Sequence, residues 1–427
     1  MGGHVLAART SVRGMRMESR RGSGVNDLKL QNRRLVLRTI AERPMISRAE
    51  LSLATGLSKM TMSNIIGELM QAGVVCESAQ ERSGAAVLGR RPGYLDLADT
   101  SPCEIGVFIS RHGVQVSVGD LRTRVLWTHS EPYPAVMNEQ ILIEMTLAGI
   151  RRALQNCRRP VLGIGLAAIG PVSIERGTIL RPANFFGMRD VPIVRAVAEE
   201  TGYPVCFTSD NMAGAQAEKL FGEGRAHENF LFLLLWEGIG CGVVVDGKLH
   251  AGEHGLGGEL GHTSICFDGP VCSCGSRGCL ETYANTEHMA EHVRRRIAGG
   301  ETSVLQGQPL NWATILNAAS VGDGVALSAV EEYCDYLSCA LVNMVNVFDP
   351  EIIYLCQHES GEGATLLAGL LQKRIYARML APDCRRMSVR CASFGERAVM
   401  AGSLALVAGK VFDGSLPFMP FHAEGGK

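Results

Sequence analysis

The sequence predicts an α/β protein in which an N-terminal winged helix-turn-helix domain precedes a two-lobed α/β body. Three observations support this fold class. Residues 25–100 hold short amphipathic helices, a glycine-containing turn and a basic β-ribbon. In residues 101–412 a strand–turn–strand pattern occurs twice, which indicates two similar halves with a cleft between them. A tight cysteine array lies in the second half.

Size and composition are those of a globular protein of two or three domains, with 427 residues, 46% apolar and 20% charged. Charge is uneven, because residues 1–100 hold 15 Lys and Arg against 9 Asp and Glu, and the remainder holds 27 against 34. A basic head on an acidic body predicts that the head binds a polyanion.

No signal peptide is evident at the N-terminus, and the longest apolar run, 230–236, is too short to span a bilayer. The fourteen cysteines are scattered, which favours reduced thiols over a disulfide framework. We therefore expect a cytoplasmic, nucleoid-associated protein with no membrane partner.

The head begins after a Gly-, Arg- and Ser-rich segment, 1–24, which we expect to be a flexible leader. An apolar pattern predicts a first helix that ends before Pro44, since proline disfavours helix in the residue before it. Ser47 and Glu50 form a capping-box pattern at the start of a short second helix, which ends at Gly56.

The third helix is expected from the cap Ser58 to the stop at Gly73. Its inner face is predicted to hold Ile65, Ile66, Leu69 and Met70. Segments 74–76 and 94–97 then form a β-ribbon with a basic tip, which is a wing.

In a helix-turn-helix, the second helix enters the DNA major groove by its N-terminal residues, and wing arginines reach phosphates or the minor groove. The predicted DNA contacts are Arg48, Ser58, Lys59, Thr61, Ser63, Asn64, Arg90 and Arg91. A three-helix module that docks proteins is the alternative. The polar third helix, the basic wing and the local charge favour DNA.

The body is predicted as alternating strands and helices. Strands are expected at 105–110, 114–118, 125–127, 161–170, 205–208, 230–235 and 243–249. Helices are expected at 141–153, from 210 to 220, and at 315–319, 325–348, 364–379 and 396–408. Residues 413–427 are predicted to be a tail.

Three cysteines and one histidine have the spacing of a metal site. The ligands are predicted to be Cys272, Cys274 and Cys279, in the pattern C-x-C-G-x-x-G-C, and His262. Three thiolates and one imidazole complete a tetrahedral shell for Zn²⁺, and a closed shell is usually structural, so we expect one structural zinc ion per chain. Free buried thiols in a glycine-rich turn are the alternative.

These motifs together resemble the ROK (repressor, ORF, kinase) family, whose body is similar to actin and sugar kinases. The resemblance rests on the phrases ISRAEL, TGLS, TMS and GRRPG in the head, on residues 236–242, and on residues 252–262 with the cysteine array. It covers residues 25–410. It implies a two-lobed body (101–412), a sugar-binding cleft and a homodimer or tetramer.

The resemblance also implies which residues would contact a sugar. Positions that match the sugar contacts of the family are Asp210, Glu259, His262 and Glu281, with Asn184 and Gly170 as weaker matches. Carboxylates suit a ligand with many hydroxyls because each offers several lone pairs. In the kinases of the family the acid at Asp210 is the general base, although a helix N-cap is a second interpretation of this residue.

The ATP site of the kinases is expected to be missing. Their first phosphate loop reads D-x-G-x-T, and we place 104–109 there, with Phe108 in the threonine position. Their second loop begins T-G-I-G, whereas Glu237 stands in the threonine position here and would repel a triphosphate. Phosphoryl transfer depends on positioning and charge stabilisation, so both losses predict no kinase activity.

The sequence therefore predicts a sugar-responsive transcriptional repressor whose dimer binds a pseudo-palindromic operator and whose effector is a sugar or sugar phosphate. An active ATP-dependent sugar kinase with a fused DNA-binding head is the alternative. A regulator with an empty cleft and a protein effector is a third possibility, which the retained cleft acids disfavour.

Overall fold

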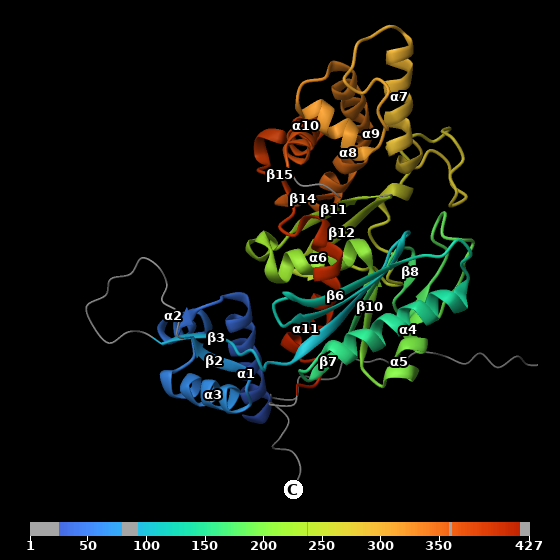
Figure 1. Cartoon of the computed structure of the whole chain (residues 1–427). Helices are drawn as coiled ribbons and strands as arrows, with labels where there is room; N and C mark the ends of the chain where they lie inside the picture. Colours follow the sequence, from blue (N-terminus) through green and yellow to red (C-terminus); the bar gives the residue numbers. More distant parts are fainter. Residues whose placement is uncertain (1–24, 79–92, 237, 358–360, 419–427) are drawn as a thin grey trace, which may run out of the picture.

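The computed structural model describes residues 25–78, 93–236, 238–357 and 361–418 (Figure 1). The head lies to one side of a body whose two lobes are stacked above one another in this view. The head consists of α1 (Val25–Glu42), β1 (Ile46–Ser47), α2 (Arg48–Thr55), α3 (Lys59–Gln71), β2 (Val75–Ser78) and β3 (Tyr94–Leu97).

Both predicted helix caps in the head are formed. The Ser47 hydroxyl accepts the backbone N–H of Glu50 at 3.2 Å, and the Glu50 carboxylate accepts the backbone N–H of Ser47 at 2.8 Å. The Ser58 hydroxyl accepts the backbone N–H of Thr61 at 3.2 Å. These caps fix where α2 and α3 begin, and hence which residues open the recognition helix.

Two details of the head differ from the prediction. Met70 is 36% exposed, and Met62 is buried in its place beside the three correctly predicted residues, because the helical period turns Met70 away from α1. The short strand β1 pairs with β3, so the ribbon is a three-stranded sheet. The predicted wing tip with Arg90 and Arg91 lies outside the described residues.

Each lobe of the body is built on a five-stranded sheet. The first has the order β10-β7-β4-β5-β6, and its strands are β4 (Cys103–Ile109), β5 (Gly113–Asp120), β6 (Val125–Pro132), β7 (Val161–Ala168) and β10 (Val205–Ser209). The second has the order β13-β12-β11-β14-β15, and its strands are β11 (Phe230–Leu235), β12 (Ile239–Val245), β13 (Lys248–Leu249), β14 (Ile352–Gln357) and β15 (Ser388–Cys391).

The two halves have the predicted similarity, since an antiparallel hairpin lies beside a parallel strand in each sheet. The hairpin β4–β5 has β7 as its parallel neighbour, and the hairpin β11–β12 has β14. A small third sheet pairs β8 (Val172–Ser173) with β9 (Thr178–Ile179).

Helices cover both faces of each sheet, which explains why the central strands are almost wholly apolar. The body helices are α4 (Glu139–Asn156), α5 (Ile193–Thr201), α6 (Asp210–Phe221), α7 (Thr286–Ala298), α8 (Trp312–Ser320), α9 (Gly324–Phe348), α10 (Glu362–Arg378) and α11 (Ala398–Asp413). Short 3₁₀ turns lie at Glu223–Ala226, Leu260–His262, Leu280–Thr282, Pro382–Cys384 and Gly395–Arg397. Helices α5 and α7 were not among the predicted elements.

The helices α6 and α11 lie between the two sheets. Alternate residues of β11 point to opposite sides, with Leu231 and Leu233 packing toward α7–α10 and Phe232 packing toward α6 and α11. The two helices approach so closely that a Cβ atom on Gly402 would lie 2.0 Å from the backbone oxygen of Ala213. Only glycine fits at this crossing.

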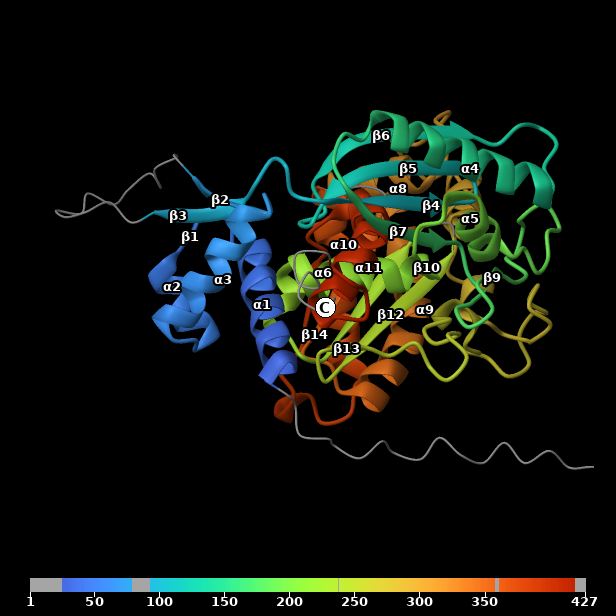
Figure 2. The same cartoon turned by 90° about the horizontal axis from the view of Figure 1, so that it is seen from below.

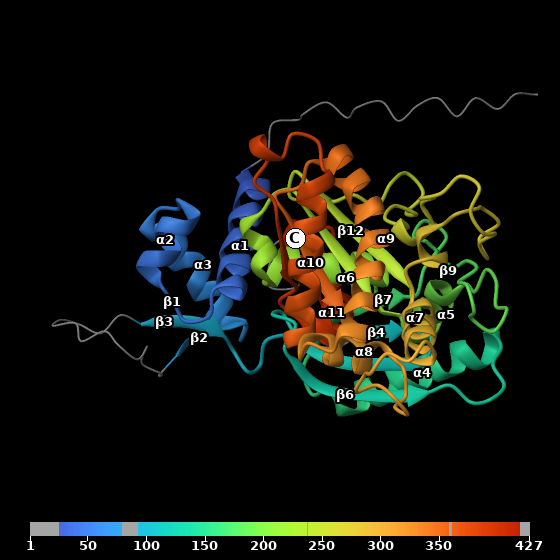
Figure 3. The same ribbon diagram turned by 90° about the horizontal axis from the view of Figure 1, so that it is seen from above.

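The head packs on the body through one hydrophobic cluster. Buried residues of α1–α3 share it with Leu121, in the β5–β6 turn, and with the C-terminal half of α11. Leu416 and Phe418, from the segment predicted to be a tail, are buried in the same cluster. Views from below and from above both show α1 beside α11 (Figures 2 and 3).

Arg122 provides the main polar contact between head and body. Its guanidinium donates to the backbone oxygens of Ile40 and Ala41, both at 2.8 Å, at the C-terminal end of α1. It also pairs with Asp96 on β3. The side chain is only 7% exposed, so the charge is satisfied by these partners and by little water.

Within the described residues no single helix is long and apolar enough to cross a membrane. The bent pair α8 and α9 meets that criterion only when the two are taken together.

The Arg122→Met substitution is expected to lower the free energy of unfolding by about 2–3 kcal/mol, because it leaves the Asp96 carboxylate and two helix-end carbonyls without their donor. Urea unfolding measures this change, and limited proteolysis of the linker after Leu97 should become faster. Arg195→Met is the matched control, since Arg195 is 73% exposed and its change should stay within about 0.5 kcal/mol. An Arg122 variant that resists urea and protease as well as the parent would contradict the role of Arg122 in holding the head on the body.

Candidate functional site

A cleft of about 790 Å³ lies between the two lobes. This volume is in the range of small-molecule sites, which run from roughly 300 to 1,000 Å³. One end of the cleft is polar and is lined by Gly170, Asp210, Asn211, Glu259, His262 and Glu281. The structure thus brings together five of the six residues predicted to contact a sugar.

Asn184 is the sixth, and it does not line the cleft. It is exposed, in the left-handed conformation with φ of 55°, on the loop before α5. This loop reaches the cleft through the backbone oxygen of Ala183, which accepts a hydrogen bond from Arg111. Asn184 is thus separate from the five grouped residues in this structure, and its contact with a sugar stays a prediction.

Asp210 is the first residue of α6, directly after β10, and the helix N-cap is Ser209. The N-cap interpretation of Asp210 is therefore wrong. Its carboxylate accepts the backbone N–H of Asn211 at 2.8 Å. Burial raises the pKa of Asp210 to about 6, against an opposing effect of that hydrogen bond and of the Arg111 charge. The carboxylate thus faces the cleft with little solvation.

Glu259 is positioned by the backbone just before it. The Gly258 oxygen accepts the backbone N–H of Cys241 on β12 at 2.8 Å and the side-chain amide of Asn211 at 3.3 Å. Burial, followed by the nearby charges of Asp210 and Glu281, raises the pKa of Glu259 to about 7. Three carboxyl groups from separate segments thus converge, in a setting where the pKa values of two are raised.

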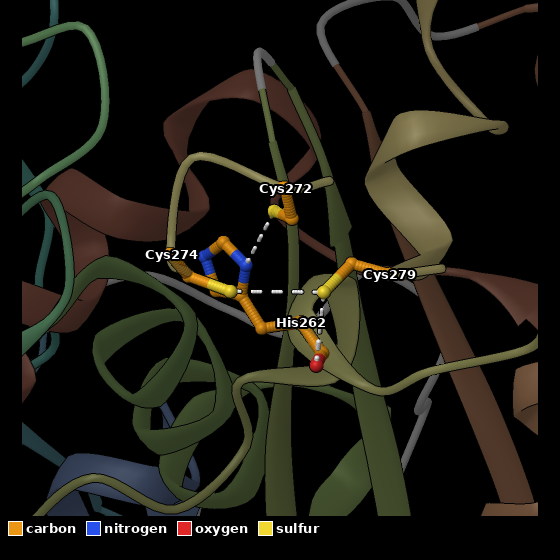
Figure 4. A group of neighbouring side chains, drawn as sticks. All are labelled: His262, Cys272, Cys274 and Cys279. Atoms are coloured by element: carbon orange, nitrogen blue, oxygen red, sulfur yellow. Dashed lines mark hydrogen bonds between the residues drawn. The ribbon is translucent and has the colours of Figure 1, made fainter. Parts of the chain in front are cut away.

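The predicted metal ligands form a compact cluster. Ligand atoms of His262, Cys272, Cys274 and Cys279 all lie within 4.8 Å of one another (Figure 4). The Sγ atoms of Cys274 and Cys279 are 3.7 Å apart, and Cys272 Sγ is 3.7 Å from His262 Nδ1. A tetrahedral zinc with Zn–S bonds of about 2.3 Å has ligand–ligand edges of about 3.6–3.8 Å, so the cluster could hold such an ion.

The loop geometry that gathers these ligands follows from two glycines. Gly275 and Gly278 have positive φ, 93° and 63°, so the chain turns back between the second and third cysteines. Glu281 lies two residues after Cys279, at the end of this loop, and its Oε1 lies 3.5 Å from His262 Nδ1. The metal cluster and the cleft acids are therefore one connected unit, with His262 in both.

The hairpin at the start of the first lobe differs from the predicted phosphate loop. Glu104 is fully buried near the start of β4 and is absent from the cleft lining. The hairpin turn between β4 and β5 does line it, with Ser110, Arg111 and His112. A phosphate loop needs turn backbone facing the ligand, so the D-x-G-x-T pattern falls on 108–112, four residues later than predicted.

This correction puts an aromatic residue in the aspartate position. Phe108 lies 5.6 Å, ring centre to ring centre, from Trp236 on the other lobe. Both line the cleft, to which they contribute aromatic side chains. Glu237 in the second loop lies outside the described residues. Arg111, His112 and Asn211 are cleft residues that were not predicted, although the predicted hairpin turn at 111–113 could have indicated the first two.

The predicted DNA contacts on α3 are mostly accessible. Lys59, Ser63 and Asn64 are exposed, whereas the hydroxyls of Ser58 and Thr61 contact one another at 2.9 Å at the cap. Arg48 pairs with Glu77 of β2 at 2.9 Å, so it is partly neutralised.

Comparison with known proteins gives consistent results for both parts of the chain. Residues 104–410 match the ROK family, and residues 30–75 match the winged helix-turn-helix DNA-binding family. The chain is 28% identical to the xylose repressor of Bacillus subtilis (strain 168) over 389 residues, covering 90% of this chain and 97% of that protein.

Two solved structures are also similar. One is a ROK family transcriptional regulator described as a homologue of the Escherichia coli Mlc protein, with a TM-score of 0.74 and 27% identity, covering 91% of this chain and 97% of that one. The other is a ROK family glucokinase from Streptomyces griseus in complex with glucose and AMPPNP, with a TM-score of 0.63 and 26% identity, covering 71% and 98%.

Replacing Cys274 by serine is expected to reduce bound metal from about one ion per chain to a small fraction, because a neutral hydroxyl is a poor ligand beside two thiolates. Stability should fall with it, since metal binding is coupled to folding. Elemental analysis and thermal unfolding measure the two effects. The exposed Cys384, changed to serine, is the control; metal content equal to that of the parent would contradict the assigned cluster.

Asp210→Asn is expected to stabilise the ligand-free protein by about 2 kcal/mol at pH 8 and to have no such effect below about pH 4. The raised pKa of Asp210, about 6, means that the folded state favours the protonated acid. The protonated Asp210 carboxyl contributes to the free energy of unfolding; this contribution is fully present below the unfolded pKa and is lost as pH rises through 6. The amide of the variant does not titrate, so its contribution does not change with pH. Urea unfolding across this pH range tests it, with exposed Asp383→Asn as control; a variant less stable at pH 8 would refute it.

Proposed function

Because the chain belongs to the ROK family and carries a winged helix-turn-helix domain, we propose that it is a sugar-responsive transcriptional repressor without kinase activity. The observation that supports this most is the lining of the cleft. It keeps Asp210, Glu259, His262 and Glu281, which suit a polyhydroxyl ligand, whereas the aromatic Phe108 stands in the aspartate position of the kinases' first phosphate loop. The full-length similarity to a xylose repressor agrees with this proposal.

In this proposal the sugar or sugar phosphate is held by Asp210, Glu259 and Glu281, which accept hydrogen bonds from its hydroxyls. A structural Zn²⁺, one per chain, is held by His262, Cys272, Cys274 and Cys279. His262 Nδ1 faces the thiolates, so its other ring nitrogen is available to the ligand. Zinc therefore orients the histidine and Glu281 and takes no part in any chemical step.

The head binds operator DNA through the exposed residues of α3, in particular Lys59, Ser63 and Asn64. A homodimer or tetramer in the cytoplasm places two such helices on a pseudo-palindrome. Arg111 adds positive charge at the turn facing the cleft acids, which suits a ligand with an anionic group.

Ligand binding and DNA binding are coupled in this proposal through the β5–β6 turn and α11. Arg122 and Thr123 line the cleft, and Arg122 also holds the end of α1. The first turn of α11 lines the cleft as well, through Met400 and Ala401, while its last turns pack on the head. A ligand that prefers one arrangement of these elements shifts the head between two positions.

One observation favours the sugar-kinase alternative. Asp210, with a pKa of about 6, has the placement and proton affinity of a general base. The aromatic pair argues against it, because phosphoryl transfer requires a site that positions and neutralises the triphosphate.

A thermal-shift screen with pentoses, hexoses, amino sugars and their phosphates tests the proposal. We expect one chemical class to raise the unfolding temperature of the parent and not of Glu259→Gln, and no sugar to be phosphorylated when ATP and Mg²⁺ are added. Duplexes selected from a random DNA library should show two half-sites, and the stabilising sugar should change their affinity.

Lys59→Ala should weaken DNA binding and reduce the salt slope by about one, with exposed Lys373→Ala as the matched control. Robust sugar phosphorylation would refute the repressor-only proposal. A screen in which no sugar stabilises the protein would point to the protein-effector alternative.

A further inference from the structure

Two cysteines far apart in the sequence have their sulfur atoms in contact on the first lobe. Cys103 is the first residue of β4, and Cys157 is the residue that ends α4, 54 positions later. Their Sγ atoms are 3.0 Å apart. The pair lies apart from the metal cluster, which is built on residues 262–279 of the other lobe.

The surroundings of the two thiols differ. Cys103 is completely buried, and its backbone N–H donates to the Pro160 oxygen at 2.9 Å, which fixes the start of β4 against the segment after α4. Cys157 is partly exposed and is followed directly by Arg158 and Arg159. Partial exposure admits a small oxidant, so Cys157 is the accessible member of the pair.

We propose that Cys103 and Cys157 are an oxidant-sensitive thiol pair that closes to an intramolecular disulfide. A disulfide needs sulfur atoms about 2.05 Å apart, so closure requires an approach of about 1 Å, which side-chain rotation at the helix end supplies.

The chemistry balances with hydrogen peroxide as the two-electron oxidant. The Cys157 thiolate attacks one peroxide oxygen, the O–O bond breaks, and the products are a Cys157 sulfenic acid and hydroxide, which takes up the proton released by Cys157 to form water. The Cys103 sulfur, on losing its proton, attacks the sulfenic sulfur. The S–S bond forms, the S–O bond breaks, and the departing hydroxide leaves as a second water with that proton.

The bond would link the start of the central strand of this lobe to the end of its covering helix. It would close a long chain loop that only packing and hydrogen bonds hold at present. Oxidation is therefore expected to raise the unfolding temperature by several degrees, chiefly by restricting the unfolded chain. In a reducing cytoplasm such a bond would be transient, as redox-responsive disulfides are.

The test uses the full-length, metal-loaded chain treated with increasing hydrogen peroxide and then analysed by non-reducing peptide mapping. We expect a peptide pair cross-linked through Cys103 and Cys157, reversed by dithiothreitol, with a raised unfolding temperature. The Cys157→Ser variant should show neither the cross-linked peptide pair nor the raised unfolding temperature. The control Cys384→Ser, at an exposed cysteine, should show both results. Metal content is measured in the same samples.

Three results would overturn the proposal. One is oxidation of Cys157 without any link to Cys103, and another is a link from Cys157 to a different cysteine. The third is a link that forms only after the metal is lost, since that would show that the pair meets only in a damaged protein. If Cys157→Ser does not fold, Cys103→Ala is substituted in the same comparison. None of these readouts depends on sugar or DNA binding.

Discussion

The close packing of α11 against α6, between the two sheets, is the contact on which the rest of the molecule depends. Gly402 allows the backbones to meet at Ala213, and this brings the lobes to a fixed separation. Because α6 begins with Asp210, the same packing sets one wall of the cleft. Because α11 ends in the hydrophobic cluster of the head, it also sets where the DNA-binding domain sits.

The cleft shows how backbone geometry can gather carboxyl groups that would otherwise repel one another. Asp210 comes from a helix start, Glu259 from a glycine-rich segment fixed on β12, and Glu281 from a turn after the cysteine loop. Burial shifts the pKa values of the first two upward, so part of the repulsion is relieved by protonation near neutral pH. The site therefore offers both hydrogen-bond acceptors and donors.

Much of this arrangement could be predicted from sequence, because the relevant signals are local. The capping box at Ser47, the cap at Ser58 and the cysteine spacing each depend on a few neighbouring residues, and all were found where predicted. The phosphate-loop pattern was placed four residues too early because the acid Glu104 was matched to the aspartate of the pattern, although the predicted strands 105–110 and 114–118 already put the hairpin turn at 111–113. The predictions failed for residues whose position in space depends on a partner far away in the sequence.

The same reason explains the other omissions. Nothing near Arg122 in the sequence indicates that it binds the end of α1, more than 80 residues away. Asn184 matched a motif, but its distance from the cleft depends on the fold of the loop before α5, where Asn184 is left-handed. The wing arginines and Glu237 lie outside the described residues, so their roles stay predictions.

The shared helix α11 limits how this chain can evolve. One end of it faces the cleft and the other faces the head, so inserting a single residue between them would rotate one face by about 100° relative to the other. Ligand preference and DNA preference can therefore diversify by substitution, but the length of α11 between them is expected to be invariant among working descendants.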